Sequence, residues 1–184
     1  RMLQWLRAFN EGKPPGARVS FYGIDTQLVF EPARRLRAYF DSVDATLPQS
    51  LGSDLQWLAT NSVLRADTTE QRNRGLRLAR SVADSLRGIL EANQEAYVSA
   101  SSSRKWDLAR RDVWTMDRAR RVVAALKRDE DLDRAYDIRD EAMAANVSWV
   151  LAHDDTERIA VWAHNAHVKD GVFDFGTESA RTMG

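Results

Sequence analysis

RIAVWAHNAH, residues 158–167, is the stretch that decides the fold. After the opening arginine, residues 159–163 are apolar on both alternating faces, a pattern typical of a strand that is covered on both sides. The run then ends in His164, Asn165 and His167. We therefore expect a core strand over residues 158–163 whose carboxyl end carries polar side chains.

A second run of this kind lies near the beginning of the chain. Residues 19–25 read VSFYGID, which is β-branched and aromatic on both faces and places Asp25 at the carboxyl end of the expected strand. Between the two runs, apolar residues recur at three- and four-residue spacing, and this predicts four or five helices over residues 32–153. Pro32 and Pro48 suit the first turn of a helix, where the missing N–H is not needed.

These patterns predict an α/β fold that is mostly helical, with a helical insert between strands of an incomplete parallel or mixed sheet. We expect three parts of one incomplete domain: a helix and core strand over 1–30, a helical insert over 31–154, and a core strand with a histidine-bearing loop over 155–184. Two strands with covered faces do not make a stable sheet by themselves. We therefore expect the remaining strands to lie outside this chain, which would make it a fragment.

Composition excludes several classes of function. The 184 residues contain 27 Lys plus Arg and 27 Asp plus Glu, and this balance argues against a nucleic-acid groove or an anionic-membrane patch. No cysteine is present, so thiolate metal sites and cysteine nucleophiles are excluded. No apolar run has the length of a bilayer span. We expect a cytoplasmic protein whose partner is a small molecule.

The histidines at the end of the second strand are the sharpest signal for chemistry. If the two expected strands are parallel neighbours, His164 and Asp25 meet at one edge of the sheet. An imidazole there can move a proton or bind a developing oxyanion. The same spacing of His164 and His167 also suits two metal ligands, for which a third ligand would be needed, or two structural histidines. By contrast, His153 falls at a predicted helix end, where a capping role is expected.

The last long helix carries polar residues on a face that otherwise points to the core. Arg139, Met143 and Asn146 share this face by helical spacing. Buried Arg and Asn side chains are costly unless they are paired. They therefore either belong to a structural network or line a polar cavity.

Together these residues resemble the erythromycin esterase family, which includes relatives described as succinoglycan biosynthesis proteins. The likeness spans nearly the whole chain and rests on Trp162-Ala163-His164-Asn165-Ala166-His167, on Arg139-Asp140-x-x-Met143-Ala144-x-Asn146-x-x-Trp149, on Phe21-Tyr22-Gly23-Ile24-Asp25 after a Trp-Leu-Arg-x-Phe-Asn helix, and on the closing Met183-Gly184.

The resemblance implies a hydrolase that opens macrolide lactone esters with a histidine-activated water, without a metal or other cofactor. His164 and His167 match the second histidine pair of the family, which helps to bind and polarise the substrate. Asp25, Arg139, Asn146 and Asn165 are the expected orienting or substrate-binding residues. The family's Gly-Glu-x-x-His-Gly segment, with the histidine assigned as general base, is absent from this sequence, so we expect the chain alone to be inactive.

Two other functions compete with this interpretation. A metal-dependent hydrolase would use His164 and His167 as ligands of a divalent ion. A non-enzymatic binding module would recognise an apolar ligand or partner through Trp and Tyr side chains, and would not depend on either histidine.

Overall fold

The computed structural model of the chain describes residues 1–44, 46–126, 132–154, 158–168, 172–174 and 179–181. Of residues 165, 166, 172–174 and 179–181 only the backbone is described. The elements are α1 (Met2–Asn10), a short 3-10 turn (Pro15–Ala17), α2 (Phe30–Val43), α3 (Gln49–Thr60), α4 (Thr69–Ala92), α5 (Gln94–Ala100), α6 (Ser103–Leu126), α7 (Leu132–His153), α8 (Asn165–Val168), β1 (Val172–Asp174) and β2 (Ser179–Arg181).

The mostly helical character predicted from the sequence is confirmed. Pro48 precedes the first residue of α3, and Pro32 lies in the first turn of α2. At the start of α4 the hydroxyl of Thr68 accepts a hydrogen bond from the backbone N–H of Gln71 at 3.1 Å, which caps the helix. Local sequence patterns therefore set where the central helices begin.

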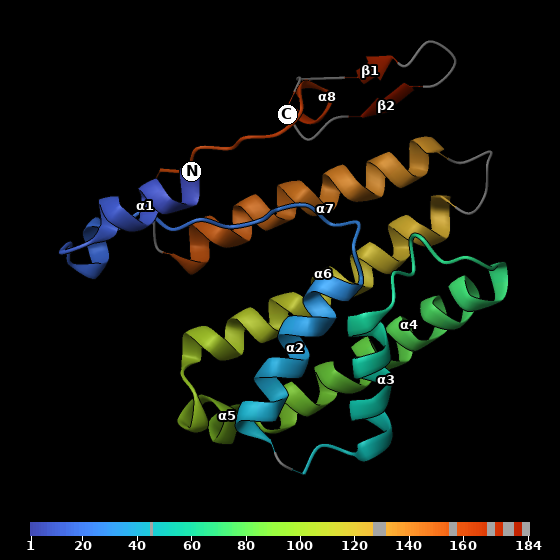
Figure 1. The fold of residues 1–184 in the computed structure, drawn as a ribbon. Coiled ribbons are helices and arrows are strands. Elements are labelled where there is room, and N and C mark those ends of the chain that lie inside the picture. The colour runs from blue at the N-terminus through green and yellow to red at the C-terminus, as the bar shows by residue number, and fades with distance from the viewer. Residues whose placement is uncertain (45, 127–131, 155–157, 169–171, 175–178, 182–184) are drawn as a thin grey trace.

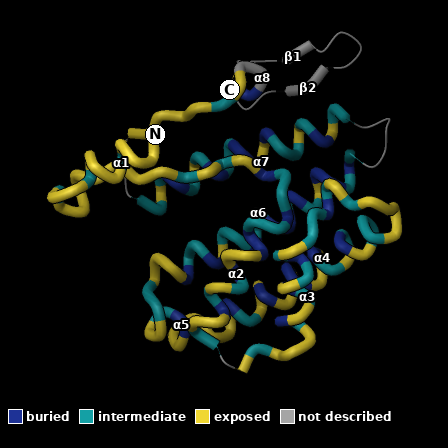
Figure 2. The backbone as a smooth tube through the Cα atoms, in the orientation of Figure 1, coloured by how far each residue is buried: buried dark blue, intermediate teal, exposed yellow. Residues whose placement is uncertain are grey.

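The hydrophobic core lies among α2, α3, α4 and α6, as the dark-blue segments of Figure 2 show. Its largest fully buried side chains include Leu36, Phe40, Leu55, Leu58, Leu86, Leu90 and Met116. Helix α7 packs along α6, and β2 lies against α7 (Figure 1). No described helix is both long enough and apolar enough to cross a membrane.

The two strands expected at residues 19–24 and 158–163 are not formed, and this part of the prediction is wrong. Both segments lack regular secondary structure, and residues 22–26 run beside α7 (Figure 1). A strand exists only when a neighbouring strand satisfies its backbone groups, whereas here the carbonyl of Ile24 accepts its hydrogen bond from a side chain of α7. The strands that the described residues do form are the antiparallel pair β1 and β2, in which Phe173 is opposite Ala180.

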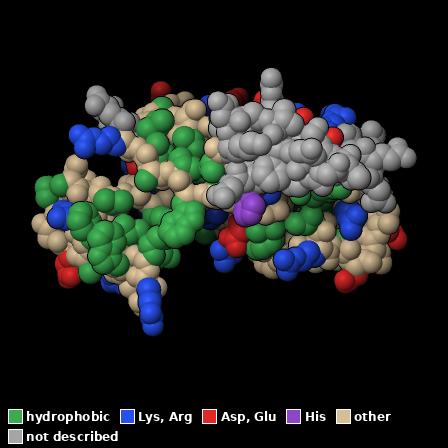
Figure 3. All heavy atoms as spheres, turned by 90° about the horizontal axis from the view of Figure 1, so that it is seen from above, with side chains coloured by type: hydrophobic (Ala, Val, Ile, Leu, Met, Phe, Trp, Pro, Cys, Tyr) green, Lys and Arg blue, Asp and Glu red, His purple; other side chains and the backbone are tan. Residues whose placement is uncertain are grey.

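Several large apolar side chains on these segments are exposed rather than covered. Trp162 is 88% exposed and Phe21 is 59% exposed. Helix α1 exposes Leu3 and Trp5 in the same way, and hydrophobic side chains gather on the corresponding part of the surface in Figure 3. Exposed apolar surface of this extent is typical of an interaction face.

Candidate functional site

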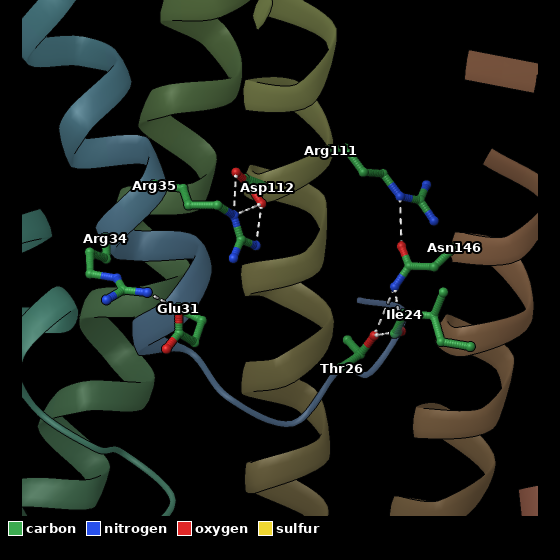
Figure 4. Close-up of polar contacts among 8 residues, drawn as sticks. All are labelled: Ile24, Thr26, Glu31, Arg34, Arg35, Arg111, Asp112 and Asn146. Atoms are coloured by element: carbon green, nitrogen blue, oxygen red, sulfur yellow. Dashed lines mark hydrogen bonds and ion pairs between the residues drawn. The ribbon is translucent and has the colours of Figure 1, made fainter. Parts of the chain in front are cut away.

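Asn146 of α7 is the centre of a polar network that fixes the extended segment before α2 (Figure 4). Its amide nitrogen donates to the carbonyl of Ile24 at 2.8 Å and to the hydroxyl of Thr26 at 3.1 Å. Its amide oxygen accepts a hydrogen bond of 2.8 Å from Nε of Arg111, on α6. The predicted site residue Asn146 is therefore buried and paired on three sides, so it ties α6, α7 and the 24–26 segment together.

About two helical turns before Asn146 on α7, Arg139 binds Asp25 with two hydrogen bonds. Nε of Arg139 lies 2.8 Å from Oδ1 of Asp25, and Nη2 lies 3.0 Å from Oδ2. Asp25 also accepts hydrogen bonds from the backbone of Thr26 and from the side chain of Gln27. Partial burial by itself would raise the pKa of Asp25, but Arg139 and these donors outweigh it and hold the pKa below its ordinary value.

The next residue of α7, Asp140, is paired with a histidine. Oδ1 of Asp140 lies 2.6 Å from Nδ1 of His167, and both side chains are buried. Burial raises the pKa of Asp140 above its ordinary value, although the neighbouring His167 and Arg139 lower it. With Asp140 ionised, Nδ1 of His167 donates the hydrogen bond, which fixes the ring and leaves Nε2 as the nitrogen for chemistry.

The structure thus brings four of the six predicted site residues, Asp25, Arg139, Asn146 and His167, to one side of α7. The sequence suggested that Asp25 could lie beside the histidines. In the described residues, Asp140 is the carboxylate that contacts His167, and Asp25 is bound by Arg139. His164 is exposed, and the side chain of Asn165 lies outside the described residues.

Sequence reasoning assigned no role to two members of this network. Asp140 was visible as a carboxylate three residues before Met143 on the apolar face of α7, and such a position requires a partner. Arg111 was visible as an arginine three residues before Trp114, and the structure stacks the two side chains at 3.7 Å. Asp140 and Arg111 are joined to His167 and Asn146 by side-chain hydrogen bonds, and no sequence pattern specifies such bonds.

A second polar cluster closes the carboxyl end of α7. His153 pairs with Asp107 of α6 at 2.6 Å and stacks on Trp149 at 4.3 Å between ring centres. Tyr22 donates to Asp154 at 2.7 Å, and burial together with this carboxylate raises the pKa of Tyr22 to about 12. His153 is thus a buried, paired side chain that links two helices, in addition to being the last residue of α7.

Comparison with known proteins assigns the chain to a family. The sequence model of the erythromycin esterase family matches residues 1–184. The chain belongs to the erythromycin esterase family. This membership supports a hydrolase-type function, and it confirms the resemblance drawn from the histidine motif and the α7 residues.

A solved structure supports the same fold. It is described as a histidine-to-asparagine mutant of an erythromycin esterase, EreC, in its open conformation, and it is similar to this chain with a TM-score of 0.67 at 18% identity. The match covers 99% of this erythromycin esterase family chain and 47% of the solved one, so the chain spans about half the length of that relative. In a search of curated proteins no sequence matched.

The alternative of a metal-dependent hydrolase requires a cluster of ligands in this member of the erythromycin esterase family. Among the described side chains, no group of three or more histidines and carboxylates is placed to hold a metal ion. The described partner of His167 is Asp140 at hydrogen-bond distance. The chelator experiment below tests the alternative directly.

Proposed function

We propose that this chain is part of an erythromycin-esterase-like hydrolase that opens macrolide lactone esters without a metal ion. The observation that carries the proposal is the buried pair of Asp140 and His167, at 2.6 Å, in a chain whose family is known. In this proposal His167 and His164 bind and polarise the ester, and the base that activates water is supplied by a part of the protein that this sequence does not contain.

The chemistry asked of His167 follows from its hydrogen bond. Asp140 holds Nδ1 and fixes the orientation of the ring, so the imidazole in its protonated form donates from Nε2 to the carbonyl oxygen of an ester. This donation becomes stronger as water adds to the carbonyl carbon and the oxygen becomes an oxyanion. The ring carbon–oxygen bond of the lactone then breaks, the alkoxide oxygen takes up the proton that the base removed from water, and a single open-chain hydroxy acid is the product.

The remaining residues position this pair. Arg139 and Asp140 are consecutive on α7, so the bidentate contact with Asp25 restrains the same turn that holds His167. Asn146 restrains the 24–26 segment one to two turns further along the helix. Asp25, Arg139, Asn146 and Asp140 are therefore positioning residues in this proposal.

The first experiment measures hydrolysis of erythromycin and of p-nitrophenyl acetate by the full-length protein that contains this chain. It is run with and without EDTA, beside the double variant His164→Ala/His167→Ala and the chain of 184 residues alone. We expect chelator-resistant activity in the full-length protein, a loss of about 100-fold or more in the double variant, and no activity in the isolated chain.

Other outcomes favour the competing functions. Activity that disappears with EDTA and returns with a divalent ion would support a metal-dependent hydrolase. A folded full-length protein that hydrolyses no ester, and whose ligand binding is unaffected in the double variant, would support a non-enzymatic binding module. Either result would overturn the proposal.

A further inference from the structure

A cavity of about 430 Å³ lies next to the network of Asn146, and its chemistry is distinct from that of the histidine pair. It is bounded by α2, α6, α7 and residues 21–25. Neither His164 nor His167 is among the residues that line it. Its volume falls within the range of ordinary small-molecule sites.

Aromatic rings and aliphatic side chains form most of the wall. Tyr22 approaches from the extended segment, Tyr39 from α2 and Trp149 from α7. Leu108 and Ala109 of α6 add aliphatic surface. A wall of this kind favours a ligand with an aromatic or aliphatic body.

The charges around the cavity do not cancel. Both carboxylates that line it are matched by arginines, since Asp112 binds Arg35 at 2.6 Å and Asp25 binds Arg139 at 2.8 Å. The cavity is also lined by Lys105 and Arg111. Within the part of the chain that the structure describes, neither of these two cations has a carboxylate at ion-pair distance.

Arg111 is the more restrained of the two cations. Its Nε is used by Asn146, and its guanidinium lies over the ring of Trp114 at 3.7 Å and faces Trp149 at 5.6 Å. Its Nη2 is buried and has no hydrogen-bond partner among the described residues. Burial and the positive charge of Arg118 lower the pKa of Arg111 to about 10. Asp107 offsets part of this lowering from one helical turn away, but that carboxylate is hydrogen-bonded to His153.

We propose that this cavity is a binding site for a small organic monocarboxylate, with Arg111 and Lys105 recognising the carboxylate and the rings of Tyr22, Tyr39 and Trp149 covering the apolar body. Arg111 lines the cavity, and its guanidinium is a planar donor group of the kind that a carboxylate matches. A carboxylate ligand supplies the counter-charge that Arg111 and Lys105 do not find among the described residues. Binding at this cavity does not require ester hydrolysis, so this proposal is tested independently of the esterase proposal.

The test compares an acid with its neutral amide. Binding of 3-phenylpropanoate and of 3-phenylpropanamide to the wild-type chain is measured near neutral pH by titration calorimetry, with a ring-to-indole nuclear Overhauser effect as the contact assay. We expect the acid to bind about tenfold or more tightly than the amide, because the charged hydrogen bonds are made by the acid alone. Addition of salt is expected to weaken the binding of the acid and to leave the binding of the amide unchanged.

Arg111 and Arg118 both lie over the ring of Trp114, so a variant of each tests which arginine causes the preference for the acid. Arg111→Gln removes the cation that lines the cavity, and we expect it to reduce the preference for the acid to about twofold or less. Arg118→Gln is the matched control, because Arg118 also lies over Trp114, at 5.2 Å, but does not line the cavity. This control is expected to retain the preference.

Equal binding of acid and amide by the wild-type chain, no saturable binding of either, or an undiminished preference in folded Arg111→Gln would each overturn the proposal. If Arg111→Gln does not fold, Arg111→Lys keeps the charge and loses the planar donors. Weaker binding of the acid by folded Arg111→Lys with unchanged binding of the amide would support the site.

Discussion

Nδ1 of His167 lies 2.6 Å from Oδ1 of Asp140, and this contact joins the histidine motif near the end of the chain to the middle of α7. The preceding residue of the same helix, Arg139, binds Asp25 from the beginning of the chain. Two consecutive residues of α7 therefore hold two segments that are far apart in sequence. The helix acts as the scaffold for both.

The first prediction concerns Asp140→Asn in the full-length protein. The amide keeps the shape of the side chain but removes the negative charge beside His167, so we expect kcat for ester hydrolysis to fall by about 100-fold. Glu141→Gln is the matched control, because Glu141 is the next residue and is exposed. Comparable kcat values for the two variants, with equal folded fractions by circular dichroism, would remove Asp140 from the mechanism.

The second prediction concerns the pH dependence of stability and the pair of Asp25 and Arg139. The folded-state pKa of Asp25 is lower than its ordinary value of 3.8, so the carboxylate stabilises the fold above that pH. This stabilisation is lost as pH falls through the lower, folded-state pKa. Because Asp25 is 45% exposed, we expect Asp25→Asn to cost only about 1 kcal/mol at neutral pH.

Urea denaturation at neutral pH and near pH 3 measures this effect. The difference between wild type and Asp25→Asn is expected to be largest at neutral pH and to shrink in acid. Glu31→Gln provides the control, because the exposed pair of Glu31 and Arg34 is worth about 0.5 kcal/mol or less. A difference that stays constant over this pH range would contradict the assignment.

The helices were predictable because their signals are local. Apolar spacing and Pro48 depend on residues within one or two turns, and α3 begins where they indicate. The expected strands at 19–24 and 158–163 failed because a strand depends on a partner, and no neighbouring strand lies beside either segment in the described residues. A run of apolar residues indicates that a segment is suited to burial, but it does not indicate which element of the fold covers that segment.

In the candidate site, too, local features are predictable from the sequence, whereas contacts between elements are not. The sequence singles out Asn146 as a costly polar residue on a core-facing helix face, and His167 as one of two histidines that follow an apolar run. Their partners, Asp140 and Arg111, come from the packing of α7 against α8 and α6, and helical spacing does not specify such contacts between elements. The hydrogen bond from Asn146 to Ile24 belongs to the same class.

The third prediction concerns Asn146→Ala. The substitution removes both hydrogen bonds to residues 24–26 and leaves Nε of Arg111 without its acceptor, so we expect a loss of about 2 to 3 kcal/mol in the free energy of unfolding. Hydrogen exchange of the Ile24 and Thr26 amides is expected to rise. Ser148→Ala on the exposed side of α7 is the control and is expected to change stability by about 0.5 kcal/mol or less. Unchanged unfolding in Asn146→Ala would show that water replaces the whole network.

The fourth prediction uses two glycines of α4 that differ only in their surroundings. A Cβ at Gly75 would lie 2.7 Å from Cγ2 of Val63 and 3.3 Å from the ring of Trp57, whereas a Cβ at Gly88 would meet nothing within 4 Å. Because β-branched Val63 is itself fully buried and stiff, it has little room to move. We expect Gly75→Ala to destabilise the protein by about 1 to 3 kcal/mol through overpacking. Gly88→Ala is expected to stabilise it by about 0.5 to 1 kcal/mol, since alanine restricts the unfolded chain and favours the helix.

Thermal and urea unfolding of the two single variants and of the double variant measure both effects. The sites lie more than three helical turns apart along α4, so we expect their free-energy changes to add in the double variant to within about 0.5 kcal/mol. Gly75→Ala combined with Val63→Ala tests the cause, because the smaller side chain removes the clash. If the contact with Val63, in the segment between α3 and α4, limits position 75, the cost of Gly75→Ala falls in that background. An unchanged cost would show that Val63 is not what limits position 75.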